Sequence, residues 1–159
     1  MKIFQGLLIC LLSVQLLSCG SSAGSDPAPT PQPTVSQLVS KSWSVSTASW
    51  DGVTQYSKGA TSNLVSGYSQ FKLDLTSSTS ASLTEFDGRK FTGTYTLSVD
   101  NKKITLNGLT SSEGAPSGTN GTLEFNIVGT PSASALSLET STTYIKASNK
   151  KVSLALVNP

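Results

Sequence analysis

The sequence of 159 residues contains no histidine. Histidine is the usual general base and the commonest metal ligand, so its absence excludes Ser-His-Asp and Cys-His catalysis and most metal sites. Cysteine is almost absent as well, because Cys10 and Cys19 both precede Gly20 and no other cysteine occurs. The chain after Cys19 can form no internal disulfide, so we expect the hydrophobic core to hold the domain together.

Charge is also scarce, at 13% of residues, with 11 Lys and Arg against 9 Asp and Glu. Nucleic-acid binding needs clustered cations, and the basic residues here form nothing denser than doublets such as 102–103 and 150–151. No phosphate-cradling motif of the G-x-x-x-x-G-K-[ST] type occurs. We therefore expect no nucleic-acid partner and no cofactor.

Carboxylates are the remaining candidates for catalysis. A glycosidase needs two of them across a cleft, one with a pKa raised by burial. Glu85 precedes Asp87 in a turn sequence, and Glu124 and Glu139 lie on separate predicted strands. All four are interpreted as solvated structural acids, so the sequence predicts that the protein is not an enzyme.

The first residues have the order of a secretory signal peptide: Lys2, then an apolar run over residues 7–17. The run is too short to span a membrane, which takes roughly 20 residues. It ends in Leu-Leu-Ser-Cys, which resembles the bacterial lipobox. That resemblance implies a signal peptide over residues 1–18 and a diacylglyceryl anchor on Cys19 that attaches the protein to a membrane. Several acyl chains hold such an anchor firmly.

Residues 19–34 form a tether rich in Pro, Ser and Gly, in which alternate prolines favour extended polyproline II. Gly20 follows the anchor cysteine, where Asp would cause inner-membrane retention in enteric-type bacteria. We therefore expect the protein to be anchored to the outer membrane, on either its periplasmic face or the cell surface. A monomeric folded domain is expected over residues 35–159.

The domain sequence predicts an all-β fold. Thr34 and Gln37 form a capping box that starts a short helix, and from Ser42 the apolar residues alternate with period two. Turn signals such as Asp51-Gly52 separate the segments, so an antiparallel meander follows: an up-and-down barrel of eight or nine strands, or a rolled sandwich. The nine candidate strands are centred on residues 43–47, 71–75, 81–85, 91–99, 104–106, 123–127, 136–138, 144–147 and 152–156.

Several segments in this order resemble a known family: LVSKSW, WDGVTQY, QFKLDLT, FTGTYTLSVDNKKITLNGL and ALSLET. Over about residues 35–157 the sequence resembles the lipocalin-like domains of Bacteroidetes-type lipoproteins. The resemblance implies a small calycin-type barrel that holds an apolar ligand.

Aromatic residues are the best candidates for a binding site. Five of them fall on apolar strand faces and would line a barrel cavity: Trp43, Phe71, Phe91, Tyr95 and Phe125. Three others fall in or beside the long link 51–69 and either contact a glycan or protein or plug one barrel end: Trp50, Tyr56 and Tyr68. The links 51–69 and 109–119 are the expected mouth loops.

Two functions stay open on these residues. In the first, a hollow barrel binds a small, mostly apolar molecule; in the second, a filled barrel is an envelope scaffold whose loops contact glycan or protein. A cavity of at least roughly 300 Å³ would favour the first, and a packed interior the second.

Overall fold

The computed structural model describes residues 31–158. The predicted signal peptide, the predicted lipidation site Cys19 and residues 19–30 of the 19–34 tether lie outside the described residues. The chain from Gln32 onward forms one compact unit. Within the described part of the chain, no helix is both long enough and apolar enough to cross a membrane.

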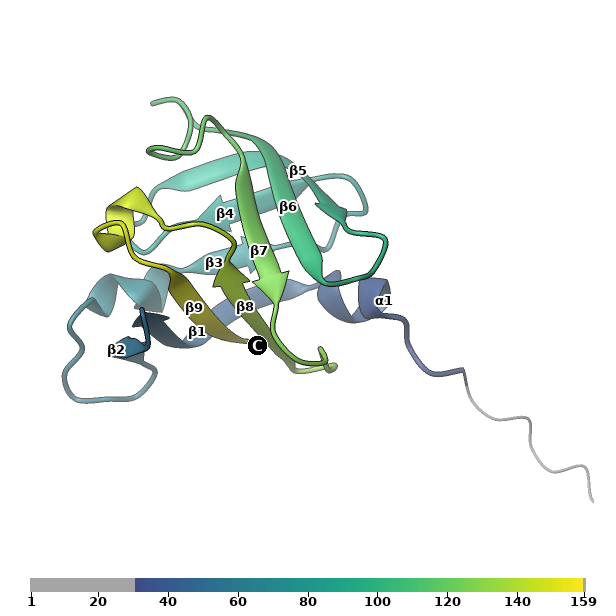
Figure 1. Ribbon diagram of the computed structural model, residues 1–159, viewed down its shortest axis with the longest axis horizontal. Helices are drawn as coiled ribbons and strands as arrows, with labels where there is room; N and C mark the ends of the chain where they lie inside the picture. Colours follow the sequence, from purple (N-terminus) through teal and green to yellow (C-terminus); the bar gives the residue numbers. More distant parts are fainter. Residues whose placement is uncertain (1–30, 159) are drawn as a thin grey trace, which may run out of the picture. The chain divides into compact units, whose positions relative to one another are not determined.

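Eight antiparallel strands form a closed barrel (Figure 1). Successive strands pair in chain order, and the last strand pairs back with the first over Ser44↔Val157 to Trp50↔Val152. The predicted all-β barrel is therefore confirmed, and the fold is lipocalin-like. The barrel strands are β1 (Ser42–Trp50), β3 (Lys72–Asp74), β4 (Ala81–Thr84), β5 (Lys90–Leu97), β6 (Lys103–Thr110), β7 (Leu123–Ile127), β8 (Ala135–Thr140) and β9 (Val152–Val157).

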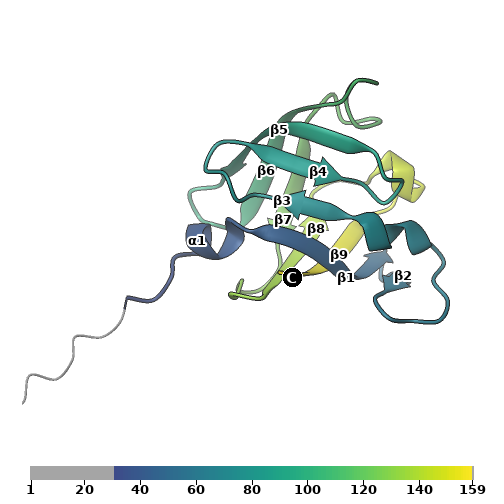
Figure 2. The same cartoon turned by 180° about the vertical axis from the view of Figure 1, so that it is seen from behind.

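A ninth strand, β2 (Val53–Ser57), lies beside β1 and outside the closed ring (Figure 2). The turn between them is Asp51-Gly52, in which both residues have positive φ (44° and 82°), the geometry of a tight hairpin. The sequence predicted only a mouth loop over 51–69. The structure places β2 there, followed by the 3-10 helix η1 (Ser66–Gln70).

Helix α1 (Val35–Val39) covers one end of the barrel, which we call the helix end. Its predicted capping box is present, with reciprocal hydrogen bonds between Thr34 and Gln37. The indole nitrogen of Trp43 donates to the carbonyl oxygen of Val39 at 2.8 Å, and Trp43 is fully buried. This contact ties α1 to β1.

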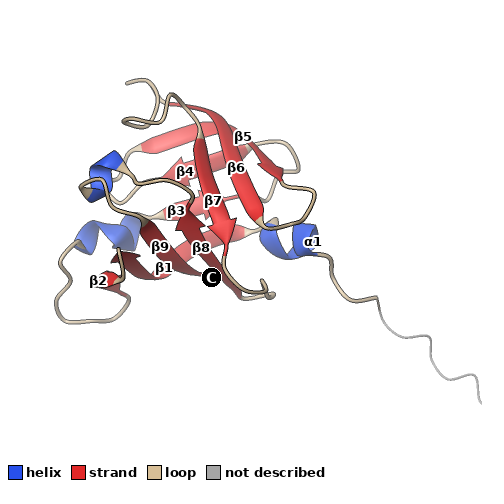
Figure 3. Cartoon of the chain, viewed as in Figure 1, coloured by secondary structure: helices blue, strands red, loops and turns tan. Residues whose placement is uncertain are grey.

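The opposite end, which we call the loop end, carries the two 3-10 helices η1 and η2 (Ile145–Ala147) (Figure 3). The sequence predicted a strand over 144–147, and this was wrong. Ser148 and Asn149 both adopt left-handed conformations (φ 55° and 58°), so the chain turns back and Tyr144 pairs with Lys150. The predicted strand itself is a helical turn, in which the amide of Ala147 donates to the carbonyl oxygen of Tyr144 at 3.0 Å, so it is not extended.

Two positions that period-two alternation predicts to face inward, Thr47 and Val99, do not do so. In β1 the register shifts between Val45 and Thr47, so Ala48 is buried and Thr47 is not. In β5 the strand ends at Leu97, and Val99 is fully exposed in a turn where the amide of Asn101 donates to the carbonyl of Ser98. Period-two reading fails at both places because a bulge and a turn each change the phase.

Candidate functional site

The barrel interior is almost completely filled. A void toward the loop end has a volume of about 20 Å³, space for about one water molecule. The surrounding side chains are mainly apolar. They are Tyr68, Phe71, Leu83, Glu85, Phe86, Leu123, Phe125, Thr140, Tyr144, Val152 and Leu154.

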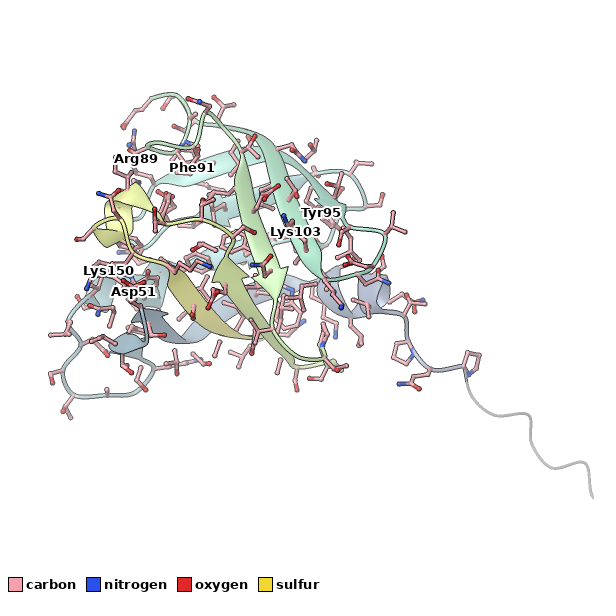
Figure 4. All side chains as sticks on the ribbon, viewed as in Figure 1. Asp51, Arg89, Phe91, Tyr95, Lys103 and Lys150 are labelled. Carbon is pink, nitrogen blue, oxygen red and sulfur yellow. The ribbon has the colours of Figure 1, made fainter. Side chains whose placement is uncertain are left out.

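The five aromatic residues predicted to line a cavity lie in three different places. Phe71 and Phe125 line the void. Trp43 and Phe91 are fully buried in the packed core and do not line it. Tyr95 is half-buried at the helix end, where its hydroxyl contacts Ser40 Oγ at 3.0 Å and donates to the carbonyl of Leu75 at 3.3 Å. Figure 4 shows Phe91 and Tyr95 near opposite ends of β5.

An aromatic cluster closes the loop end of the barrel. The rings of Tyr68 and Phe86 lie 4.8 Å apart, and Trp50 Nε1 donates to the Tyr68 hydroxyl at 2.8 Å. Tyr56 and Tyr68 are only 7% and 1% exposed, so Trp50, Tyr56 and Tyr68 do not form an exposed patch. Of the two interpretations given to them, their burial matches the plug. Burial also raises the pKa of Tyr68 to about 12.

A buried ionic cluster adjoins this plug. The carboxylate of Glu85, only 3% exposed, accepts hydrogen bonds from the Tyr144 hydroxyl and from Lys146 Nζ. Lys146 Nζ also lies 2.7 Å from Asp87 Oδ2. The expectation that Glu85 is a solvated acid was therefore wrong. Glu85 continues the alternation of the inward-facing Ala81 and Leu83, and this pattern could have indicated that it is buried. Its charge favoured the opposite interpretation.

Three members of the cluster have shifted pKa values. Burial and the hydrogen bond to Glu85 raise the pKa of Tyr144. Burial is the largest single influence on Lys146 and Asp87 and opposes their charged forms. Their hydrogen bonds and the opposite charges nearby together outweigh it, so the pKa of Lys146 is raised and that of Asp87 is lowered. Lys146 therefore stays a cation between two carboxylates, and the cluster ties η2 to the turn between β4 and β5.

The other two predicted acids are only partly buried. Glu124 Oε2 lies 3.0 Å from Lys103 Nζ, and Glu139 Oε1 lies 3.6 Å from Lys151 Nζ. Neither faces Glu85 across a cleft, because both alternate with inward-facing residues on their strands. Among the described residues, no group of three or more Cys, Asp and Glu side chains could hold a metal ion.

A groove on the outer surface of the loop end is much larger than the internal void. Its volume is about 430 Å³, and it lies between the start of β7, the preceding loop and the segment that carries η2. It is rich in hydroxyl groups, which the sequence analysis did not single out. It is lined by Gly118, Thr119, Thr122, Leu123, Glu124, Thr140, Thr142, Thr143, Tyr144, Ile145 and Asn149.

Comparison with known proteins finds similar folds only among solved structures; no protein-family model and no curated protein matches the chain. A lipocalin-like protein from Bacteroides uniformis ATCC 8492 has a TM-score of 0.46 and 16% identity, covering 77% of this chain and 99% of that one. An uncharacterized protein from Bacteroides eggerthii DSM 20697 has a TM-score of 0.44 and 13% identity, covering 75% and 98% respectively.

The ionic cluster predicts an asymmetric response to mutation. Lys146→Met leaves the buried Glu85 carboxylate without its cation, which costs roughly 3–5 kcal/mol of unfolding free energy. The double variant Glu85→Gln/Lys146→Met removes both charges and should recover most of that loss. Urea denaturation measures both. Lys103→Met, which breaks a half-exposed pair, is the control and should cost at most about 1 kcal/mol. An equal effect of Lys146→Met and Lys103→Met would contradict the buried cluster.

The pKa shifts predict loss of stability in alkali. Tyr68, Tyr144 and Lys146 all have a pKa raised above the ordinary values of 10.0 and 10.5, so the folded state binds their protons more tightly than the unfolded state. Their contribution is complete below those values and declines as the pH rises above about 10. Unfolding free energy measured from about pH 8 to about pH 12 should fall, and Tyr68→Phe should reduce the slope. A flat profile would show that these groups titrate alike in both states.

Proposed function

We propose that the protein is a non-catalytic binding protein, anchored to the outer membrane by lipid on Cys19, whose filled barrel carries an outer binding groove at its loop end. The observation that supports this is a difference in volume. The interior void is about 20 Å³, whereas small-molecule sites usually have roughly 300 Å³ or more, and the groove has about 430 Å³.

In this proposal the barrel is a rigid scaffold. Small eight-stranded barrels can be filled by their own side chains, and function then depends on the loops at their ends. Here the loop end is held from both sides: Trp50 and Tyr68 are hydrogen-bonded in the plug, and Lys146 ties η2 to Glu85. The groove therefore has walls that need little rearrangement to bind a partner.

The absence of catalysis is part of the proposal. The groove contains one charged side chain, Glu124, and that carboxylate is paired with Lys103. Glu85 is bound to Lys146 and to Tyr144, so it has no free proton-transfer partner. A glycosidase mechanism of the usual kind would need two carboxyl groups with different pKa values facing a common substrate.

A second candidate function is the binding of a small, mostly apolar molecule inside the barrel. It is favoured by the largely apolar lining of the void and by its position under the loop end, which is covered by η1, η2 and the turn that carries Phe86. Such a ligand could enter only if the Tyr68–Phe86 plug moved aside. The two candidates therefore differ in whether the plug opens.

An apolar fluorescent probe separates them. N-phenyl-1-naphthylamine should show no saturable fluorescence increase with the native protein, because the barrel has no room for it. Phe125→Ala removes a buried ring beside the void and should create a dry cavity that binds the probe, which controls for its ability to report. Saturable binding to the native protein, abolished by an internal Leu83→Trp substitution, would instead establish the apolar-ligand function.

The anchor is tested by metabolic labelling with palmitate in a bacterial host. Cys19→Ser should abolish incorporation of label and release the protein from the membrane fraction, because the sulfur that accepts the diacylglyceryl group is lost. Cys10→Ser is the matched control and should remain labelled, since it lies in the predicted signal peptide. Labelling that persists in Cys19→Ser would overturn the assignment.

A further inference from the structure

We infer that the outer groove binds a neutral, hydroxyl-rich ligand, that is, a carbohydrate. The inference rests on the proposed function, because it requires that the binding site lie outside the barrel. It specifies the chemistry of the ligand from the side chains that line the groove, their free hydrogen-bonding groups and their charge.

The groove offers polar groups that the protein itself does not use. The hydroxyls of Thr122, Thr142 and Thr143 and the amide of Asn149 are exposed, and within residues 31–158 no hydrogen bond joins them to another protein group. Each of these groups both donates and accepts hydrogen bonds. Sugar hydroxyls do the same, so either partner can be the donor in each hydrogen bond between a sugar and this lining.

The remaining hydroxyls of the groove fix its shape. Thr140 Oγ1 accepts from the amide of Val152 at 3.0 Å. Thr119 Oγ1 donates to the carbonyl of Pro116 at 2.8 Å and accepts from the amide of Gly121 at 3.1 Å. These internal bonds hold both walls in place, and the unused hydroxyls are presented from walls that are already ordered.

The charge of the groove selects against anions. Among its lining residues there is no Lys or Arg, and the one carboxylate, Glu124, would repel a phosphate, sulfate or uronate group. Recognition of such anions normally relies on charge-assisted hydrogen bonds from cations. A neutral saccharide needs no counter-charge and meets no unpaired charge here.

An apolar surface completes the site. Ile145 is 53% exposed on η2, next to the buried Tyr144 and opposite Gly118. A β-carbon added at Gly118 would lie 3.1 Å from Ile145 Cγ2, so the two walls approach each other closely at this point. A pyranose ring has an apolar C–H face and a hydroxyl rim, and the Ile145 side chain beside threonine hydroxyls provides for both.

The test uses nuclear magnetic resonance of isoleucine and threonine methyl groups in the folded domain. The probes are neutral maltohexaose, cellohexaose, xylohexaose and mannohexaose, with hexagalacturonate as an acidic counterpart. At least one neutral probe should shift the methyl signals of Thr142, Thr143 and Ile145 saturably. The fully buried Ile104 should not move, and hexagalacturonate should shift nothing.

A matched pair of variants tests the hydroxyls themselves. Thr142→Val/Thr143→Val keeps the side-chain shape and removes two hydroxyls, so affinity for the active saccharide should fall roughly tenfold or more. Thr94→Val/Thr96→Val changes two exposed threonines on β5, outside the groove, and should leave affinity unchanged. Equal affinity of the two double variants would overturn the role of the groove hydroxyls.

Three further outcomes would contradict the inference in different ways. If no neutral saccharide shifts the groove signals at millimolar concentration, the carbohydrate assignment fails. If a random peptide library shifts the groove signals and the saccharides do not, the ligand class is wrong while the outer site of the proposed function stands. If an apolar molecule shifts Ile104 and the groove signals stay still, the proposed function itself fails.

Discussion

The pairing of β1 with β9 is the contact on which the rest of the structure depends. It closes the sheet, so that every barrel strand has two neighbours and the apolar faces of all eight point to one interior. Because the chain after Cys19 has no cysteine, no covalent bond supports this closure. The folded domain therefore relies on filling the enclosed space, and Trp43, Phe91 and Leu73 do so with no exposed surface.

A filled interior moves the polar features of the protein to the loop end. Three segments outside the barrel strands meet there: η1, η2 and the turn that carries Phe86. The buried Glu85–Lys146 pair joins the last two. Such a pair contributes little net stability compared with an apolar replacement, but separating its members is costly, because it leaves a buried charge without a partner. Its effect here is to place η2, and with it Ile145 and the neighbouring threonines, as one wall of the groove.

Much of the barrel could be predicted from local sequence, since period-two alternation and turn residues report directly on strands and hairpins. The errors occur at the irregularity of β1 near Thr47, at the turn that exposes Val99, at the 3-10 helix over 145–147 and at β2, which was predicted only as a loop. The site was less predictable. Glu85 was interpreted as a solvated acid although it continues the Ala81-Leu83 alternation, and its partner Lys146 is too distant in the chain to be inferred from the residues near Glu85.

The sequence by itself determined the all-β class, the antiparallel meander, the capped first helix and the absence of histidine and disulfide chemistry in the domain. These follow from composition and short-range periodicity, which need no knowledge of distant residues. Only the tertiary structure decided whether the barrel is hollow or filled and which loops form a groove. Both depend on how side chains from distant strands share a fixed volume, so a void of about 20 Å³ and a groove of about 430 Å³ appear only once the barrel is closed.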